Sequence, residues 1–339
     1  MRTIIINRSL LLLVSVLTAV SLRAMTVSPS QTVCRGTDVV LTRAGSSGEN
    51  PESDTIKYRF QRSDDNVAYV NATTSSEDGL TLSQRIDADT WFRLQCTTKS
   101  GIVWYSDTLL VSVYADITAG VISEAQTICH ATQPNQLTIT TAPAGGDGNF
   151  TYQWQSRTGK GAYADIALAT ADSYSPGVLS ETTWYRLKVT GVCGEQYTNE
   201  VEITVRPALT APVIANADEI VCYNAEPSQI TLSSEATGGE DESFRYQWQE
   251  SYDGITFTDI AGAGWKSHKP FRVKQTKWFR VVAISLRGCG QITSSNVHKV
   301  TVYDEFIVTT KGLDAPLCYM TTGEISVSAT GAGGAYTYQ

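Results

Sequence analysis

The sequence has few of the residues that enzymes use for chemistry. Histidine occurs only three times in 339 residues, at His130, His268 and His298. No zinc-protease, nucleophile-elbow, P-loop or dinucleotide-binding motif is present, and the seven cysteines lack the Cys-x-x-Cys spacing of zinc sites. We therefore predict a non-enzymatic protein with no catalytic residue, metal or cofactor, and we interpret the histidines as solvated surface residues.

Positive charge is also scarce. The chain has 26 Lys and Arg against 34 Asp and Glu, and without the three arginines of residues 1–24 its net charge falls from −8 to −11. A surface this acidic, without a basic cluster, disfavours binding to nucleic acid or anionic membranes. Acidic residues gather in the loops before the predicted third strands: Glu49, Glu52, Asp54, Asp147, Glu240, Asp241 and Glu242. Their spacing varies, so we interpret them as solvated loops rather than calcium sites.

Long hydrophobic runs are absent after the N-terminus. Leu10 to Leu22 form one apolar stretch behind Arg2 and Arg8, too short to cross a bilayer comfortably, and Ala24 or Ser21 supplies a small residue for cleavage. This pattern predicts a signal peptide over residues 1–24, with an uncleaved membrane anchor as the alternative. The mature chain would then enter an oxidising compartment, where cysteines usually pair.

A repeat of about 94 residues is the strongest signal in the chain. The first cysteine of each unit recurs after 95, 93 and 96 residues. Two sets of aromatic residues keep the same period: Phe60, Trp154 and Trp248, and Trp91, Trp184 and Trp278. We predict repeats at residues 25–115, 116–208 and 209–303, followed by the truncated start of a fourth at 304–339.

Within one unit the hydrophobic period is two. In the second repeat apolar and polar residues alternate from Leu137, again from Tyr185 and again from Val201, and glycine-rich turns such as 145–148 separate the runs. About seven short strands in 90 residues, each with one buried face, indicate an antiparallel β-sandwich, so the fold class is all-β.

The aromatic residue of the third strand is predicted to fill each core. It is Trp154 or Trp248 in the later repeats and Phe60 in the first. Trp184 and Arg186 are two positions apart and share a face of their strand, which predicts that the arginine stacks on the tryptophan.

The cysteines are expected to pair within repeats. One cysteine precedes the second strand and another follows the sixth, and we expect the two to meet at one end of the sandwich. The predicted bonds are Cys129–Cys193 and Cys222–Cys289, each stabilising its repeat by roughly 4 kcal/mol. Cys34–Cys96 is the corresponding prediction in repeat one. Cys96 falls on an inward strand position, so a buried thiol is the alternative there.

Several short segments resemble a known module. They are Tyr-Gln-Trp-Gln at 152–155, Asp-Ile-Ala at 165–167, Ser-Tyr-Ser-Pro at 173–176, Thr-Thr-Trp-Tyr-Arg at 182–186 and Cys-Gly at 193–194. In this order they resemble the Ig-like (PKD-like) repeats of large surface proteins of the Bacteroidota, related to those of gliding-motility adhesins. The resemblance implies tandem Ig-like sandwiches on the surface of a Gram-negative bacterium, exported by a type IX route.

The predicted function is a secreted or cell-surface structural or adhesive stalk with an unidentified protein or glycan ligand. Its partners would include further repeats of the same chain, and no nucleic acid or transmembrane segment. The alternatives are a carbohydrate-binding array, which needs exposed aromatics on one face of several domains, and accessory domains of an enzyme encoded beyond Gln339.

The fourth unit is predicted to be incomplete. Residues 336–339 align with 150–153 and stop one residue before the expected tryptophan. Cys318 would then be unpaired, with its partner lying further along, and this accounts for the odd cysteine count. We expect so short a remnant to be disordered, to dock on repeat three or to present an unpaired strand edge to another chain.

Overall fold

The computed structural model describes residues 26–27, 31–44, 57–72, 81–97, 101–305, 307–310 and 327–330. Every regular element in these ranges is a β-strand, and they contain no helix that is long and apolar enough to cross a membrane. The predicted signal peptide, Cys318 and the last nine residues lie outside the described residues. So do Glu49, Glu52 and Asp54.

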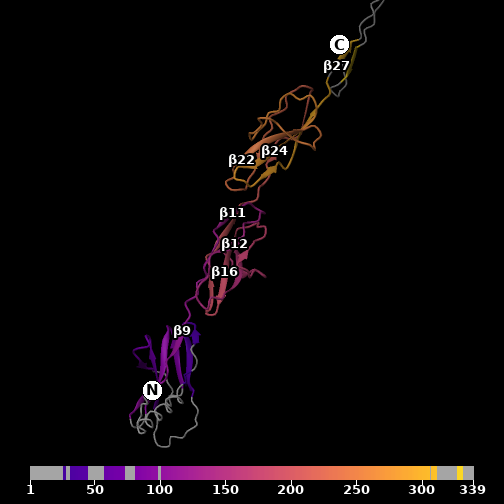
Figure 1. Ribbon diagram of the computed structural model, residues 1–339. Helices are drawn as coiled ribbons and strands as arrows, with labels where there is room; N and C mark the ends of the chain where they lie inside the picture. The colour runs from indigo at the N-terminus through magenta and orange to yellow at the C-terminus, as the bar shows by residue number, and fades with distance from the viewer. Residues whose placement is uncertain are drawn as a thin grey trace, which may run out of the picture.

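Three β-sandwich domains follow one another along the chain in one elongated array (Figure 1). We refer to them as repeat 1 (β1–β9), repeat 2 (β10–β18) and repeat 3 (β19–β26). Each pairs a small sheet with a larger one around its own hydrophobic cluster. The predicted architecture, all-β with tandem Ig-like sandwiches, is confirmed.

Repeat 2 shows the topology most fully. Its small sheet has the order β10-β12-β15, and its larger sheet the order β11-β18-β16-β13-β14, with β17 also paired to β16. All neighbours are antiparallel except β11 and β18, which run parallel. The strands are β10 (Val121–Ile122), β11 (Gln126–Ile128), β12 (Leu137–Thr141), β13 (Thr151–Thr158), β14 (Ala164–Asp165), β15 (Ser173–Tyr174), β16 (Thr183–Gly191), β17 (Gly194–Tyr197) and β18 (Val201–Val205).

Repeat 1 has the same plan, with sheets β1-β3-β6 and β2-β9-β7-β4-β5 and with β8 paired to β7. Its parallel pair is β2 and β9. The strands are β1 (Thr26–Val27), β2 (Gln31–Val33), β3 (Thr37–Ala44), β4 (Lys57–Ser63), β5 (Val70–Asn71), β6 (Thr81–Ile86), β7 (Thr90–Thr97), β8 (Val103–Tyr105) and β9 (Leu109–Val113).

Repeat 3 keeps the larger sheet in the order β20-β26-β24-β22-β23, with β25 on β24, and its small sheet is the pair β19-β21. An isolated bridge between Ile230 and His268 stands where repeat 2 has β15. The strands are β19 (Val213–Ile214), β20 (Glu219–Val221), β21 (Leu232–Ser234), β22 (Phe244–Ser251), β23 (Thr258–Asp259), β24 (Lys277–Ser285), β25 (Gln291–Thr293) and β26 (His298–Val302).

Two further strands follow repeat 3 in the part of the chain that the structure describes. β27 (Ile307–Thr310) pairs antiparallel with β28 (Val327–Thr330). This pair corresponds to β19–β21 in repeat 3 and to β10–β12 in repeat 2, which are also antiparallel. The pair thus matches the opening strands of repeats 2 and 3 in order and direction.

In their described residues repeats 1 and 2 have nine strands each, more than the roughly seven predicted, because two strands of the sandwich are divided. The first crosses between the sheets, so β10 belongs to the small sheet and β11 to the larger one. The last is interrupted, and β17 and β18 both pair with β16. This division matters for the junctions, since it places β11 beside the strand that leaves the domain.

Alternation along the strands builds the cores. In β16 the side chains of Tyr185, Leu187 and Val189 are buried, and the residues between them are partly exposed. Phe60, Trp154 and Trp248 have no exposed surface. The indole Nε1 of Trp154 donates a hydrogen bond to the Ala171 carbonyl (3.0 Å), and that of Trp248 donates to the Trp265 carbonyl (2.9 Å). Each ring is therefore buried with its one polar atom satisfied.

Candidate functional site

The junctions between consecutive repeats combine covalent bonds, ion pairs and tightly packed backbone. Their geometry follows from strand direction. β11 runs parallel to β18, with Ile128 opposite Val205, so the cysteine that follows β11 lies where the chain leaves the repeat. We call this end the C-terminal pole. Cys193 lies in the turn between β16 and β17, at the opposite N-terminal pole.

The two cysteines of one repeat therefore cannot meet. Cys193 and Val205 are separated by a strand length, roughly 30–40 Å at ~3.3 Å per residue, whereas a disulfide needs Cα atoms within about 7 Å. The predicted bonds Cys129–Cys193 and Cys222–Cys289 are wrong for this reason. Our expectation that both cysteines lie at one end of the sandwich overlooked the parallel strand pair.

Both disulfides of the described residues join neighbouring repeats. Cys34 of repeat 1 bonds to Cys193 of repeat 2, and Cys129 of repeat 2 bonds to Cys289 of repeat 3. The Cα–Cα distance is 5.4 Å in each, and the sequence separations are 159 and 160 residues. A C-terminal pole is thus bonded to the N-terminal pole of the next repeat.

The predicted Cys34–Cys96 bond is also wrong, since Cys34 bonds to Cys193. Cys96 occupies an inward position of β7 and is buried in repeat 1. The turn of repeat 1 that corresponds to Cys193 has no cysteine in the sequence. Of the two poles of repeat 1, only the C-terminal one therefore has a cysteine, Cys34.

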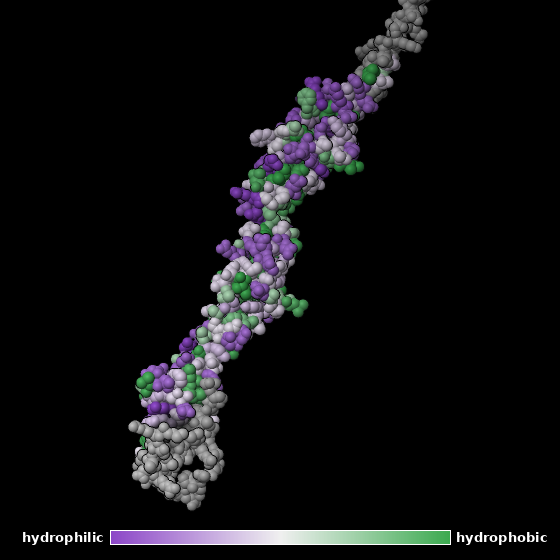
Figure 2. Space-filling model, viewed as in Figure 1, coloured by the Kyte–Doolittle hydropathy of each residue, from purple (hydrophilic) through white to green (hydrophobic). Residues whose placement is uncertain are grey.

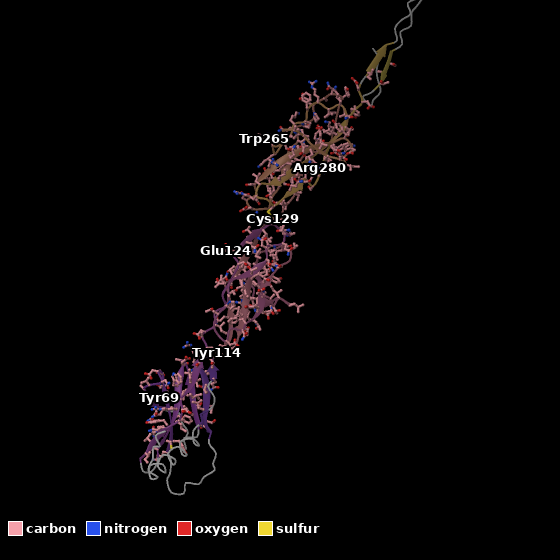
Figure 3. The ribbon with its side chains drawn as sticks, in the orientation of Figure 1. Tyr69, Tyr114, Glu124, Cys129, Trp265 and Arg280 are labelled. Atoms are coloured by element: carbon pink, nitrogen blue, oxygen red, sulfur yellow. A yellow bond between two sulfur atoms is a disulfide. The ribbon has the colours of Figure 1, made fainter. Side chains whose placement is uncertain are left out.

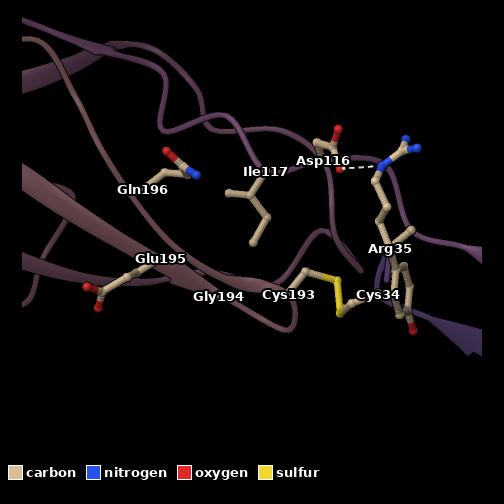
Figure 4. A pocket seen from close by; sticks show the side chains of 9 residues that line it. Cys34, Arg35, Asp116, Ile117, Cys193, Gly194, Glu195 and Gln196 are labelled. Atoms are coloured by element: carbon tan, nitrogen blue, oxygen red, sulfur yellow. Dashed lines mark hydrogen bonds and ion pairs between the residues drawn. A yellow bond between two sulfur atoms is a disulfide. The ribbon is translucent and has the colours of Figure 1, made fainter. Parts of the chain in front are cut away.

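The first junction adds an exposed ion pair and a cavity. Arg35, next to Cys34, places its Nε 3.3 Å from Asp116 Oδ1, and it also donates to the Asp87 carbonyl (2.8 Å). The disulfide and this ion pair line a cavity of about 320 Å³, shown in Figure 4. Both charged side chains are more than half exposed, so the pair contributes little by itself.

The second junction is organised by Arg206, the first residue after β18. Its guanidinium contacts Glu240 Oε2 at 2.6 Å and donates to the Arg287 carbonyl at 3.0 Å. Its side chain is only 18% exposed, so this ion pair is better shielded from water than the first. Figure 3 shows Cys129 at this junction and Tyr114, which is the residue equivalent to Arg206, at the first.

Each linker is held against a glycine pair of the next repeat. The Gly146 N–H donates to the Ala115 carbonyl (2.8 Å), and the Gly239 N–H donates to the Pro207 carbonyl (3.0 Å). Gly145 and Gly238 have positive φ, and a Cβ at either would overlap a linker carbonyl oxygen. Glycine is required at both positions because the backbones approach so closely.

The outward face of the larger sheets carries stacks of rings and cations. Arg186 lies between Tyr163 and Tyr197, 4.1 and 4.0 Å from the ring centroids, and Arg93 lies in the same way between Tyr69 and Tyr105. The predicted stacking of Arg186 on Trp184 is wrong, because Arg157 covers that ring at 4.6 Å.

A glutamine orients the central arginine of each stack. The Nε of Arg93, Arg186 and Arg280 donates to the side-chain oxygen of the glutamine opposite it on the neighbouring strand: Gln61 (2.8 Å), Gln155 (2.8 Å) and Gln249 (2.7 Å). In repeat 3 Arg280 has one ring beside it, Phe257 at 4.1 Å. Sequence reasoning missed these partners, although Gln61, Gln155 and Gln249 keep the repeat period.

Two of the three histidines are not surface residues. His298 has no exposed surface, and its Nε2 lies 3.5 Å from Glu219 Oε1. His268 is partly buried between the rings of Trp248 and Phe279, with centroids 5.9 and 6.0 Å away. Burial lowers the pKa of His268 below its usual 6.5, opposed by the charge of Glu250. Only His130 is exposed as predicted.

The acidic loops take part in ordinary polar contacts where they are described. Glu240 and Asp241 pair with Arg206 and Arg287, and Asp147 accepts hydrogen bonds from Asn149. The described residues include no group of three or more His, Cys, Asp or Glu placed to hold a metal ion.

The family model described as Domain of unknown function (DUF8696) matches this chain three times, at residues 23–115, 118–207 and 211–304. No curated protein matches.

Solved structures with several tandem domains are similar at low identity. Domains 3–5 of the Drosophila OTK extracellular region match at 13% identity, covering 83% of this chain and 97% of that one, with a TM-score of 0.30. The three N-terminal domains of the bacteriophage RB49 outer capsid protein Hoc match at 11%, covering 84% and 99%, with a TM-score of 0.34. Titin domains A168–A170 match at 13%, covering 83% and 99%, with a TM-score of 0.31. All three TM-scores lie below 0.5, and it is the strand topology that shows the fold of this chain.

Proposed function

We propose that this chain, which belongs to the family Domain of unknown function (DUF8696), is a non-enzymatic extracellular stalk whose Ig-like domains are clamped in line by disulfides between neighbours. One observation carries the proposal. Each of the two disulfides bonds the C-terminal pole of one repeat to the N-terminal pole of the next. A bond in this position restricts the angle between two domains. A spacer needs such a restricted angle to stay extended.

The linkers support the same function. A domain boundary with few contacts would leave the domains free to move. Here the disulfide and the linker form two separate attachments between adjacent repeats, and the linker is hydrogen-bonded to the next repeat's glycine pair. Two attachments restrict both bending and rotation of one domain against the next. The array would therefore hold its two ends apart.

The location outside the cytoplasm is supported by the same bonds. Disulfides persist in oxidising compartments, and the sequence begins with the pattern of a signal peptide. The finer proposal, drawn from the sequence resemblance, is display on the surface of a Gram-negative bacterium through a type IX route. Protease treatment of intact cells tests it: digestion of the chain supports surface display, whereas full protection contradicts it.

Small-angle X-ray scattering of residues 25–339 tests the stalk. Three domains in line would reach on the order of 100 Å, and we expect an extended, rigid profile. The double variant Cys34→Ser with Cys129→Ser should give a broader distance distribution typical of flexibly linked domains. Cys222→Ser leaves both interdomain disulfides intact. It is the matched control and should give the same scattering profile as the parent. A compact particle for the parent would overturn the proposal.

A carbohydrate-binding array is the second candidate. Rings recur on the outward face of the larger sheet in all three repeats, as such an array requires, and Tyr105 and Tyr197 are more than 40% exposed. Against it, guanidinium groups already cover ring faces that a sugar would use. On the face viewed in Figure 2, hydrophilic residues are interspersed with small hydrophobic groups along the repeats. Binding of the three-repeat chain on a glycan array, lost in Tyr197→Ala, would favour this candidate.

A further inference from the structure

Cys222 occupies the position in repeat 3 that Cys34 and Cys129 occupy in the repeats before it. It directly follows β20, which runs parallel to β26, as the other two follow β2 and β11. It therefore lies at the C-terminal pole of repeat 3. Cys222 is an exposed free cysteine, whereas each of its two equivalents is bonded to the next repeat.

The backbone around the three cysteines is held in the same way. The residue after each last strand donates its N–H to the carbonyl that precedes the cysteine, in Tyr114 to Val33 (2.9 Å), Arg206 to Ile128 (2.9 Å) and Tyr303 to Val221 (3.0 Å). The same hydrogen bond and the same parallel strand pair therefore precede the cysteine in all three repeats. The backbone that leads to Cys222 matches the backbone that leads to the two bonded cysteines.

The chain beyond this pole begins another unit of the same kind. β27 and β28 form the antiparallel pair that opens repeats 2 and 3. Cys318 follows Cys222 by 96 residues and so aligns in sequence with Cys222, not with Cys193 or Cys289. By this equivalence Cys318 is not the partner of Cys222.

We propose that Cys222 is the site of a third interdomain disulfide, made to a cysteine in the turn of the fourth repeat that corresponds to Cys193 and Cys289. The separations of 159 and 160 residues in the existing bonds place that cysteine beyond Gln339. In forming the bond the two thiols lose two protons and two electrons. A thiol–disulfide oxidant, such as the disulfide of an oxidoreductase or oxidised glutathione, takes both and becomes a pair of thiols.

The inference extends the proposed stalk, since each such bond would clamp one more domain, but its test is separate. The fourth repeat can be completed with residues of this chain. Residues 336–339 align with 244–247, so a copy of residues 248–303 appended after Gln339 continues the unit in register. The copied Cys289 then lies 159 residues after Cys222, which matches the spacing of the Cys34–Cys193 bond.

The experiment is non-reducing peptide mapping after oxidative refolding with glutathione and blocking with N-ethylmaleimide. We expect the Cys222 peptide to be bonded to the copied Cys289 peptide in the extended chain and to be alkylated in the 339-residue chain. The extended chain with serine in place of the copied Cys289 is the matched control, and there Cys222 should again be alkylated. A bond from Cys222 to Cys318, or to Cys222 of a second copy, would overturn the proposal.

A measurement on the natural protein decides the matter if the completed repeat does not fold. Cells are treated with N-ethylmaleimide before breakage, and the isolated chain is mapped without reduction. Cys222 bonded to a cysteine about 160 residues further on supports the proposal, and alkylated Cys222 overturns it. Scattering from the same protein reports the extended shape independently, so a free Cys222 in an extended chain would reject this bond and leave the stalk in place.

Discussion

Repeats 2 and 3 share the strand order of their larger sheets but differ in the core and at the junction that precedes them. In repeat 2 the ring stack is Trp154, Tyr174 and Tyr185. In repeat 3 the corresponding stack is Trp248, His268 and Phe279, and it continues to the buried His298. The fold accommodates histidine in place of Tyr174 and Val201 because the backbone pairing at both positions is retained.

The preceding junctions differ in their ion pairs. The first relies on Arg35 and Asp116, which are both largely exposed, and the second on the mostly buried Arg206 with Glu240. The disulfide and the glycine pair are common to both junctions. The disulfide and the glycine pair are thus the constant part of a junction, and the charged contacts are the variable part.

The largest expected effect separates the two cores. Trp154→Ala should cost roughly 3–5 kcal/mol, because it removes a large buried ring and leaves a cavity. Hydrogen exchange measured by mass spectrometry should show faster exchange across strands β13, β16 and β18 of repeat 2, with repeat 3 unchanged. Trp248→Ala should give the reverse pattern. If either variant showed faster hydrogen exchange in both repeats, the repeats would not be independent folding units.

A smaller effect distinguishes the two junctions. Arg206→Ala removes a shielded, charge-assisted contact and should weaken docking of repeats 2 and 3 by about 1–2 kcal/mol. Titration with glutathione measures this as a roughly tenfold lower effective concentration of the Cys129 and Cys289 thiols. Arg35→Ala should change the corresponding value for Cys34 and Cys193 by a few-fold at most, since exposed pairs contribute about 1 kcal/mol or less. Equal effects would mean that burial does not explain the difference.

Acid should weaken repeat 3 and leave repeat 2 largely unaffected. Burial lowers the pKa of His268 in the folded chain, so the unfolded chain, with a pKa near 6.5, binds the proton more readily. The free energy of unfolding of repeat 3 should therefore be constant above about pH 7 and should fall as the pH drops through 6.5. Denaturant unfolding at several pH values, monitored by hydrogen exchange in each repeat, measures this free energy.

The matched control is His268→Tyr, which installs the residue found at position 174 of repeat 2. It should reduce the pH dependence of repeat 3 without a large change at pH 8. An unchanged pH dependence would show that His268 is not the group responsible.

The smallest effect concerns exposed rings. The Trp265 side chain is 78% exposed, and its backbone carbonyl accepts the Trp248 hydrogen bond. Trp265→Ala keeps that carbonyl, so the free energy of unfolding, measured by thermal unfolding, should change by about 0.5 kcal/mol or less. A loss comparable to that in Trp248→Ala would show that the Trp265 ring is packed in solution.

Most of the fold could be predicted from the sequence because local signals carried it. The period of about 94 residues defines the repeats, and the alternation along residues 183–191 defines an inward face that the structure places in the core. The division of the first strand between two sheets was missed, since β10 and β11 are two and three residues long and too short to show a period of their own.

The sequence by itself determined that this protein is a tandem array of β-sandwiches, since repetition and alternation are written residue by residue. Only the tertiary structure decided which cysteines meet. Each pairing depends on the direction of a short parallel strand and on the stacking of one domain on the next, and neither leaves a local pattern. Arg35 and Arg206 were missed for the same reason: a surface arginine gains its partner only when the following domain is placed against it.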